Sequence, residues 1–189
     1  MEMKRCRWVN SDPLYVSYHD EEWGRPVKDD RLLFERISLE GMQAGLSWIT
    51  VLKKRENFRK AFYDFDIDKV AQMDEEADVA RLMLDSGLIR SQQKLRSVIR
   101  NARHVQKMQQ EGLSLTDFLW SFAPSDPYIH SEKGLAQSPE SEAMSKALKK
   151  RGFSFIGPVI CYALMQAIGM VQDHLPECEF HQQPLKAQK

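Results

Sequence analysis

The chain has 189 residues, with 27 Lys and Arg against 27 Asp and Glu, so its formal net charge is zero. Hydrophobic residues make up 42% of it and aromatic residues 10%, which is typical of a folded protein and excludes a disordered one. The length suits one domain, or two small lobes that share a core. A neutral total charge argues against a protein that coats nucleic acid or membranes nonspecifically, although it leaves room for a local basic face.

An N-terminal signal peptide is not recognisable, and three cysteines do not suit a secreted disulfide framework. The sequence therefore predicts a cytoplasmic protein with no membrane association. Residues 155–171 are the one stretch apolar enough to suggest a membrane span, but Gly157 and Pro158 interrupt it. Because proline suits the first turn of a helix, this stretch instead predicts a buried core helix that starts at Pro158 and stops before Gly169.

Apolar residues recur at helical spacing along most of the chain, and strand-like alternation of useful length is missing. The sequence therefore predicts an all-α fold. Residues 124–139 are predicted to form a surface loop that carries no functional motif. A first helix is expected after the caps Asp29 and Asp30, and a second over residues 46–62. Two short helices are expected after the acidic caps at 66–68 and 74–76, and a long one from Ser91 to the stop at Gly112. The remaining helices are expected over 116–122, over 141–151 and from Pro158.

Charge is distributed unevenly along these elements. Residues 64–85 contain eight acidic and two basic residues, whereas residues 90–107 contain six basic residues and no acid. Lys146, Lys149, Lys150 and Arg151 form a second basic cluster. Either cluster alone could be a solvated helix face, but two clusters beside glycine-containing turns favour a surface that faces phosphates.

Residues 149–158 read as the end of one helix, a short turn with Gly152 and Gly157, and a new helix. Such a hairpin exposes backbone N–H groups and a helix N-terminus, which together bind anions, and Lys149 and Lys150 flank it. This is the layout of a helix-hairpin-helix clamp on a DNA backbone. A plain helical hairpin closed by glycines is the alternative.

Cysteine and histidine residues lie near both ends of the chain. His174 and Cys178 have a spacing that suits half of a zinc site, and Cys6 with His19 would complete a Cys2His2 set that ties the two ends together. His181 is an alternative ligand, and unrelated buried cysteines and exposed histidines are the alternative to a site. Cys161 is expected to pack in the core, and His104, His130 and His181 are expected to lie on the surface.

Aromatic residues are concentrated between residues 8 and 48, and Glu40 lies in a stretch otherwise suited to burial. A carboxylate among aromatic rings is desolvated, and flat rings with one carboxylate suit a purine that stacks and presents hydrogen-bond donors. A plain aromatic core with Glu40 as a helix cap is the alternative. The aromatic residues concerned are Trp8, Tyr15, Tyr18, Trp23, Phe34 and Trp48.

Several ordered motifs are spread along the chain: CRW at 6–8, DPLYVSYHDEEWG at 12–24, LEGMQAGLSW at 39–48, LKKRE at 52–56, GFSFIG at 152–157, CY at 161–162 and MQA at 165–167. Together they closely resemble the constitutive bacterial 3-methyladenine DNA glycosylases of type I, a family within the helix-hairpin-helix glycosylase superfamily. The resemblance runs from Cys6 to Cys178.

The resemblance implies a monofunctional enzyme that hydrolyses the N-glycosidic bond of 3-methyladenine in alkylated double-stranded DNA. Free 3-methyladenine and an abasic site would be the products. The resemblance further implies one glycosylase unit over residues 1–189, with two helical lobes, a pocket between them and one structural zinc ion at the joined chain ends. A monomer is expected.

Site roles follow from the same resemblance, position by position. Glu40 would be the catalytic, base-contacting carboxylate. The other implied roles are base binding by Tyr18, Trp48, Tyr15, Trp8 and Trp23, DNA-backbone contact by Gly152, Gly157, Lys149, Lys150, Arg90 and Lys94, and zinc binding by Cys6, His19, His174 and Cys178.

The sequence departs from its relatives at two places. Superfamily members use a catalytic Asp after the hairpin, but here no acid follows Gly157 before Asp173, so that Asp is expected to be missing. Gln92 stands where relatives commonly carry a positive charge, which puts one DNA-backbone contact in doubt.

The missing Asp fits the chemistry of the lesion. An N3-methylated adenine is cationic, so its glycosidic bond is already labile, and Glu40 is expected to act mainly in base recognition and charge stabilisation. Two alternatives stay open: a glycosylase for another damaged base, and a zinc-stabilised module that senses alkylated DNA without cleaving the bond.

Overall fold

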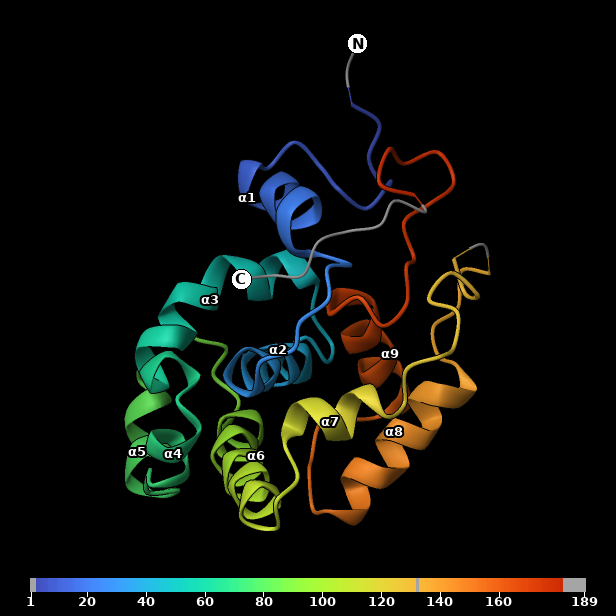
Figure 1. The fold of residues 1–189 in the computed structure, drawn as a ribbon. Helices are drawn as coiled ribbons and strands as arrows, with labels where there is room; N and C mark the ends of the chain where they lie inside the picture. Colours follow the sequence, from blue (N-terminus) through green and yellow to red (C-terminus); the bar gives the residue numbers. More distant parts are fainter. Residues whose placement is uncertain (1–2, 132, 182–189) are drawn as a thin grey trace.

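The computed structural model describes residues 3–131 and 133–181, and every regular element among them is helical (Figure 1). The all-α prediction is therefore confirmed. The elements are α1 (Pro13–Ser17), the π-helical turn η1 (Tyr18–Glu22), α2 (Asp30–Met42), α3 (Trp48–Ala61), the 3-10 turn η2 (Tyr63–Phe65), α4 (Ile67–Ala71), α5 (Ala77–Leu82), α6 (Gln92–Gln110), α7 (Leu115–Trp120), α8 (Pro139–Lys150) and α9 (Pro158–Ala167).

The helix ends follow the capping residues in the sequence. The Asp29 side chain accepts a hydrogen bond from the Leu32 N–H at 2.9 Å at the start of α2, and Ser91 caps α6 in the same way. α8 begins at Pro139, two residues earlier than expected, because Ser138 and Ser141 form a reciprocal capping box. α9 begins at Pro158 as predicted.

α1 and η1 were not expected from the sequence. Asp12 caps α1 by accepting a hydrogen bond from the Leu14 N–H at 3.0 Å, and Pro13 occupies the first turn. η1 then closes with a hydrogen bond from the Trp23 N–H to the Tyr18 carbonyl at 2.8 Å. A wider helical turn brings Tyr18 and His19 inward together, and both are buried.

α2 lies at the centre of the fold, where it contacts α3, α6, α7 and α9 (Figure 1). Every residue from Leu33 to Met42 is buried. The helix therefore carries three charged side chains, Glu35, Arg36 and Glu40, into the interior. Buried charges need partners, a ligand or a change of protonation, so α2 is where chemistry is expected.

The two ends of the described chain lie side by side (Figure 1). The Glu179 N–H donates to the Lys4 carbonyl at 3.0 Å, and Arg7 pairs with Glu177 at 2.7 Å. None of the described helices has the length and apolarity needed to cross a bilayer, and residues 158–167 form the buried core helix that was predicted.

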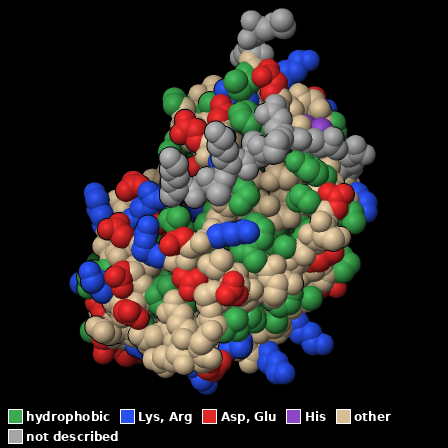
Figure 2. Space-filling view, in the orientation of Figure 1, with side chains coloured by type: hydrophobic (Ala, Val, Ile, Leu, Met, Phe, Trp, Pro, Cys, Tyr) green, Lys and Arg blue, Asp and Glu red, His purple; other side chains and the backbone are tan. Residues whose placement is uncertain are grey.

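The interpretation of residues 90–107 as a basic surface is wrong for three of its six cations. Arg100 and Arg103 pair with Glu75 at 2.8 and 2.7 Å, and Arg96 pairs with Glu76 at 3.0 Å. The acidic segment thus neutralises the basic one where α5 packs on α6. Figure 2 shows acidic and basic side chains interspersed on the visible face.

Candidate active site

A cavity of about 330 Å³ opens beside the C-terminal half of α2, and its size suits one nucleobase with room for water. Its walls come from the N-terminal segment, the first helical turns, α2, α3, α9, the loop before α8 and the chain after α9. The lining residues are Trp8, Tyr15, Tyr18, Trp23, Glu40, Gln43, Trp48, Ser131, Gly134, Leu135, Ala163, Gln166, Asp173 and Leu175.

The five aromatic residues proposed for base binding all line this cavity, with Glu40. Trp8 contacts Tyr15 and Trp23 with ring centroids 5.0 and 5.1 Å apart, and Tyr18 lies 5.5 Å from Trp48. Such tilted and edge-on contacts fix the rings without filling the space between the two groups. The aromatic residues are therefore cavity walls and not solely core, although Phe34 is fully buried away from the cavity.

Glu40 is 4% exposed, and burial raises its pKa to about 8, with Arg36 opposing the shift. Among the described residues, none hydrogen-bonds its carboxyl group, so Glu40 does not act as a helix cap. A carboxyl group in this position gains most when a cation or a hydrogen-bond donor enters the cavity.

An ion-pair network supports the floor of the cavity beneath Tyr18. Glu22 accepts from Arg36 at 2.7 Å and from Arg55 at 2.7 and 2.9 Å. Burial opposes the ionisation of Glu22, but Arg55 and Arg36 outweigh it and lower its pKa to about 2. Burial and the neighbouring Glu40 raise the pKa of Tyr18, so its phenol stays protonated and can donate a hydrogen bond.

The loop before α8 forms one wall of the cavity through Ser131, Gly134 and Leu135. The loop lies mainly on the surface, as predicted, and contributes to the cavity although no motif marked it. The surface position expected for His130 is wrong, because this residue is 5% exposed. The His130 ring packs on Tyr162 at 6.0 Å, and its Nε2 lies 3.4 Å from Glu140. These contacts hold the loop against α8 and α9.

Sequence reasoning missed four polar residues of the cavity, Gln43, Ser131, Gln166 and Asp173. Asp173 Oδ2 accepts hydrogen bonds from the Tyr162 hydroxyl at 2.8 Å and from Gln166 Nε2 at 2.7 Å. Tyr162 and Gln166 are four residues apart on α9, so they present both donors on one helix face. The only sequence signal was that Asp173 is the first acid after the hairpin.

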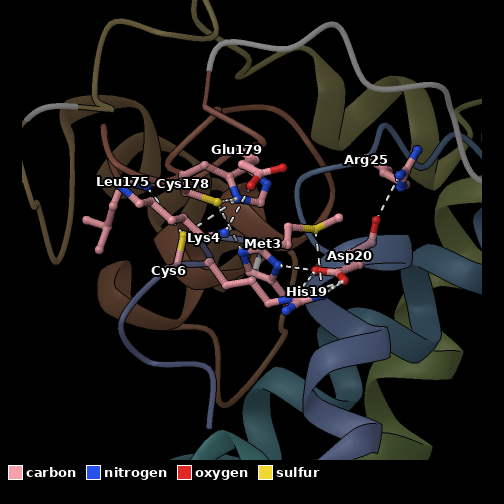
Figure 3. A network of polar contacts seen from close by, with 11 residues as sticks. Met3, Lys4, Cys6, His19, Asp20, Arg25, Leu175, Cys178 and Glu179 are labelled. Carbon is pink, nitrogen blue, oxygen red and sulfur yellow. Dashed lines mark hydrogen bonds and ion pairs between the residues drawn. The ribbon is translucent and has the colours of Figure 1, made fainter. Parts of the chain in front are cut away.

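Cys6, His19, His174 and Cys178 form one buried cluster, as predicted. Their ligand atoms all lie within 4.8 Å of one another. Cys178 Sγ is 3.5 Å from His19 Nε2 (Figure 3). It is also 3.6 Å from His174 Nδ1, and that nitrogen lies 3.6 Å from Cys6 Sγ. His181 lies outside the cluster, where its ring contacts the His174 carbonyl at 2.7 Å.

The donor set of this cluster fits a metal ion. His19 Nδ1 lies 2.7 Å from Asp20 Oδ1, which leaves Nε2 free to bind a metal (Figure 3). Burial lowers the pKa of both histidines, to about 4 for His174, so both rings are neutral as ligands must be. Burial also raises the pKa of the Cys6 thiol to about 12, so a cation is needed to hold a thiolate there.

The hairpin between α8 and α9 has the expected form. Gly152 has a φ of +93°, and a Cβ at this position would lie 2.6 Å from the His104 ring. Gly157 is the N-cap of α9. Lys149 and Lys150 are exposed at the end of α8, and their contact with a DNA backbone stays a prediction.

Two further residues, Arg90 and Lys94, are predicted to contact DNA near the start of α6. Arg90 is exposed. Lys94 is half-buried, and its ammonium group donates to the Met42 and Ala44 carbonyls at 3.0 and 2.6 Å. Lys94 therefore caps the end of α2 and supports the loop that leads to Trp48. Contact with DNA stays a prediction for both residues.

Residues 8–182 match the family model described as methyladenine glycosylase. The chain belongs to this family. It is 54% identical to the DNA-3-methyladenine glycosylase 1 of Escherichia coli K12 over 180 residues, which cover 93% of this chain and 96% of that protein. It is 49% identical to the DNA-3-methyladenine glycosylase of Haemophilus influenzae over 178 residues, covering 92% and 96%.

Solved structures of the family have the same fold. A crystal structure of a 3-methyladenine DNA glycosylase I superposes with a TM-score of 0.90 at 53% identity, covering 94% of this chain and all of that one. A Staphylococcus aureus structure, described as showing the basis of 3-methyladenine recognition, has a TM-score of 0.89 at 36% identity, covering 96% and 98%. The family resemblance of the motifs and the fold expected from it are thus confirmed.

Proposed function

We propose that this protein is a monofunctional DNA glycosylase that flips 3-methyladenine out of alkylated DNA and hydrolyses its glycosidic bond. The observation that carries the proposal is the cavity in which five aromatic side chains surround the buried Glu40. Family membership supports it, because relatives that match nearly the whole chain are named for this activity. Free 3-methyladenine and an abasic site are the products.

Recognition follows from the charge of the lesion. A 3-methyladenine in DNA is cationic, and aromatic faces attract a cation more than a neutral ring. Glu40 and Tyr18 then hydrogen-bond the exocyclic amino group and the N7 edge of the base, while Trp48 stacks on it. A normal adenine brings no positive charge. Glu40 would then either stay protonated and attract the base less, or ionise at a cost in free energy because no cation offsets its burial.

Bond cleavage needs little assistance once the base is held. The bond between C1′ and the base breaks with both electrons leaving on the base, which becomes neutral and needs no proton. The positive charge moves to the sugar, water adds to C1′, and the added water loses a proton to solvent. Glu40 acts here in recognition and charge stabilisation, with water activation secondary.

We propose that the buried cluster of two cysteines and two histidines holds one structural zinc ion. Zinc supplies the positive charge that two thiolates need and fixes the relative position of both chain ends. The cluster also supports the cavity, because Trp8 packs on His19 at 5.2 Å and Trp23 packs on His174 at 4.6 Å. Two walls of the base pocket thus rest directly on ligand side chains.

DNA binding is proposed to use the hairpin between α8 and α9 as a helix-hairpin-helix clamp. Gly152 and Gly157 admit a phosphate, while Lys149, Lys150 and Arg90 supply charge, and Lys94 acts mainly through the loop it supports. We propose that the chain works as a cytosolic monomer of two helical lobes with the pocket between them.

The test is abasic-site formation in methylated duplex DNA. The proposal predicts abasic sites that accumulate with time, in strands that stay intact until alkali is added. Lesion-specific binding without any abasic product would instead identify a sensing module. Strand breaks without alkali would overturn the monofunctional assignment.

A further inference from the structure

Asn101 joins the long helix α6 to the tip of the hairpin, residues 152–157. Its side chain is buried, with the residue 4% exposed. The amide oxygen accepts a hydrogen bond from the Ser154 N–H at 3.1 Å, and the amide nitrogen donates to the Ser154 carbonyl at 3.1 Å. Among the described residues, no other side chain of α6 hydrogen-bonds the hairpin. Asn101 therefore uses both polar groups of its amide on a single hairpin residue.

The next residue of the hairpin has an unfavourable backbone conformation. Phe155 has a φ of +55°, in the left-handed region that side chains other than glycine rarely adopt. Such a conformation persists only where surrounding contacts hold it. Phe153 and Ile156 are buried and anchor the turn, but a groove of about 380 Å³ opens between α6 and the tip at Ser154 and Phe155. Because packing is incomplete there, the two hydrogen bonds from Asn101 stabilise the strained conformation.

Phe155 also sets the position of the hairpin against α2. A Cβ at Gly41 would lie 3.3 Å from both the Cβ and the carbonyl oxygen of Phe155, so the hairpin lies directly on α2 at this glycine. Gly41 follows Glu40, which lines the cavity. The shape of the hairpin therefore decides how far the proposed DNA clamp lies from the residue proposed to recognise the base.

The tip of the hairpin carries backbone donors that are free to bind a ligand. The N–H groups of Phe155, Ile156 and Gly157 have no hydrogen-bond partner among the described residues. Neighbouring N–H groups bind a phosphate when the backbone holds them in one concave arrangement. That arrangement depends on the φ of Phe155, so DNA binding should depend on the contact made by Asn101.

We propose that Asn101 is a positioning residue for DNA. By holding Ser154 it keeps the hairpin in the left-handed conformation that binds the DNA backbone at a fixed distance from Glu40. The inference rests on the proposed function, in which this hairpin is the DNA clamp. Asn101 does not line the cavity, so its loss should weaken DNA binding and leave base binding intact.

The experiment measures two affinities for wild-type protein and for Asn101→Ala. Fluorescence anisotropy measures binding to a duplex that contains a tetrahydrofuran abasic-site analogue, and tryptophan fluorescence measures binding of free 3-methyladenine. The Kd for the duplex is expected to rise about tenfold, because the hairpin is no longer preorganised. The Kd for the free base should change less than about threefold, because the base contacts only the cavity.

Ser97→Ala is the matched control. Ser97 lies one turn earlier on α6 and is also buried, but its hydroxyl donates to the Lys94 carbonyl at 2.6 Å and not to the hairpin. This variant should bind the duplex and the free base as wild type does. A loss of duplex affinity in Ser97→Ala equal to that in Asn101→Ala would contradict a specific role for Asn101.

A double-mutant cycle with Phe155→Gly separates positioning from general stability. Glycine adopts a positive φ without strain, so the hairpin needs Asn101 less, and Asn101→Ala should then weaken duplex binding by about threefold or less. Equal weakening in both backgrounds would overturn the inference. So would unchanged duplex affinity in Asn101→Ala, or a parallel loss of base affinity. Wild-type protein that neither binds the duplex nor forms abasic sites would overturn the proposed function itself.

Discussion

Glu40 shows how a single side chain can make this cavity selective. Its carboxyl group lies on the buried helix α2, and its pKa of about 8 leaves it mostly protonated near neutral pH. A cationic base that enters the cavity favours the ionised form, so binding and ionisation reinforce each other. A neutral base provides no such compensation.

The buried Glu40 should also make stability depend on pH. Its folded-state pKa of about 8 exceeds the ordinary value of 4.5, so the folded protein holds more protons than the unfolded chain between these values. The free energy of unfolding should therefore fall as pH rises from about 4.5 to about 8, because the folded protein must release the proton of the buried Glu40. Glu40→Gln should remove this fall, and at pH ~9 its free energy of unfolding should exceed that of wild type by on the order of 1–3 kcal/mol.

Urea unfolding at pH ~5 and pH ~9 measures this difference. Glu21→Gln is the control, because Glu21 is an exposed acid on the adjacent π-helical turn. Equal pH dependence in Glu40→Gln and wild type would contradict the assigned protonation of Glu40.

Residue types with unusual demands could be named from the sequence, and ordinary polar residues could not. Cysteines, tryptophans and an acid in an apolar stretch each need a special environment, so Cys6, Trp48 and Glu40 stood out. Asp173 and Ser131 reach the cavity only because the chain turns back after α9 and the loop before α8 folds inward. That path depends on tertiary packing, which no local pattern records.

At the scale of elements, the long helices could be predicted because their caps and apolar periods agree. α6 begins after Ser91, and α2 begins after Asp29, as expected. α1 and η1 were missed because five-residue helices contain too few residues to show a period. The Asp12-Pro13 pair, a cap followed by a first-turn proline, was the signal that could have found them.

The hairpin between α8 and α9 gives a prediction at this scale. Gly152 and Gly112 both have positive φ, +93° and +84°, so alanine should cost about 1 kcal/mol at either position. Only at Gly152 would the added Cβ meet a neighbour, the His104 ring at 2.6 Å. Gly152→Ala should therefore lower the free energy of unfolding more than Gly112→Ala, by about 1 kcal/mol or more.

Denaturant unfolding of both variants measures the difference, and DNA affinity should fall only for Gly152→Ala. His104→Ala introduced together with Gly152→Ala should recover part of the lost stability, because the two changes share one contact. Equal destabilisation by the two alanine variants would show that the His104 ring moves aside freely.

At the scale of the whole molecule, the described segments before α1 and after α9 meet beside the pocket. The cysteine and histidine cluster joins the segment before α1 to the segment after α9, and Trp8 and Trp23 rest on its histidines. Net charge is uninformative at this scale, because Glu75 and Glu76, just before α5, pair with three of the arginines on α6. At the hairpin, Lys149 and Lys150 are exposed while Arg151 pairs with Glu111 at 3.0 Å, so binding to undamaged DNA should be weak.

Cys178→Ser tests this junction of the two segments. The variant is expected to lose bound zinc and about 3 kcal/mol of stability, since a metal ligand is lost and the chain ends separate. Base affinity should fall with it, because Trp8 and Trp23 lose their support. Metal analysis and thermal unfolding measure the first two effects, with Cys161→Ser as the control: Cys161 is buried outside the cluster, and serine can still donate to the Ile156 carbonyl. Full zinc content in Cys178→Ser would remove this residue from the ligand set.

In the proposed function, the cavity around Glu40 and Trp48 selects 3-methyladenine and the protein cleaves the bond between this base and the sugar. Mass spectrometry of the bases released from methylated duplex DNA tests it most directly, since 3-methyladenine and 7-methylguanine are both cationic and occur in the same sample. We expect release of 3-methyladenine, with 7-methylguanine left in the DNA. Release of 7-methylguanine at a similar rate, or of no base at all, would contradict it.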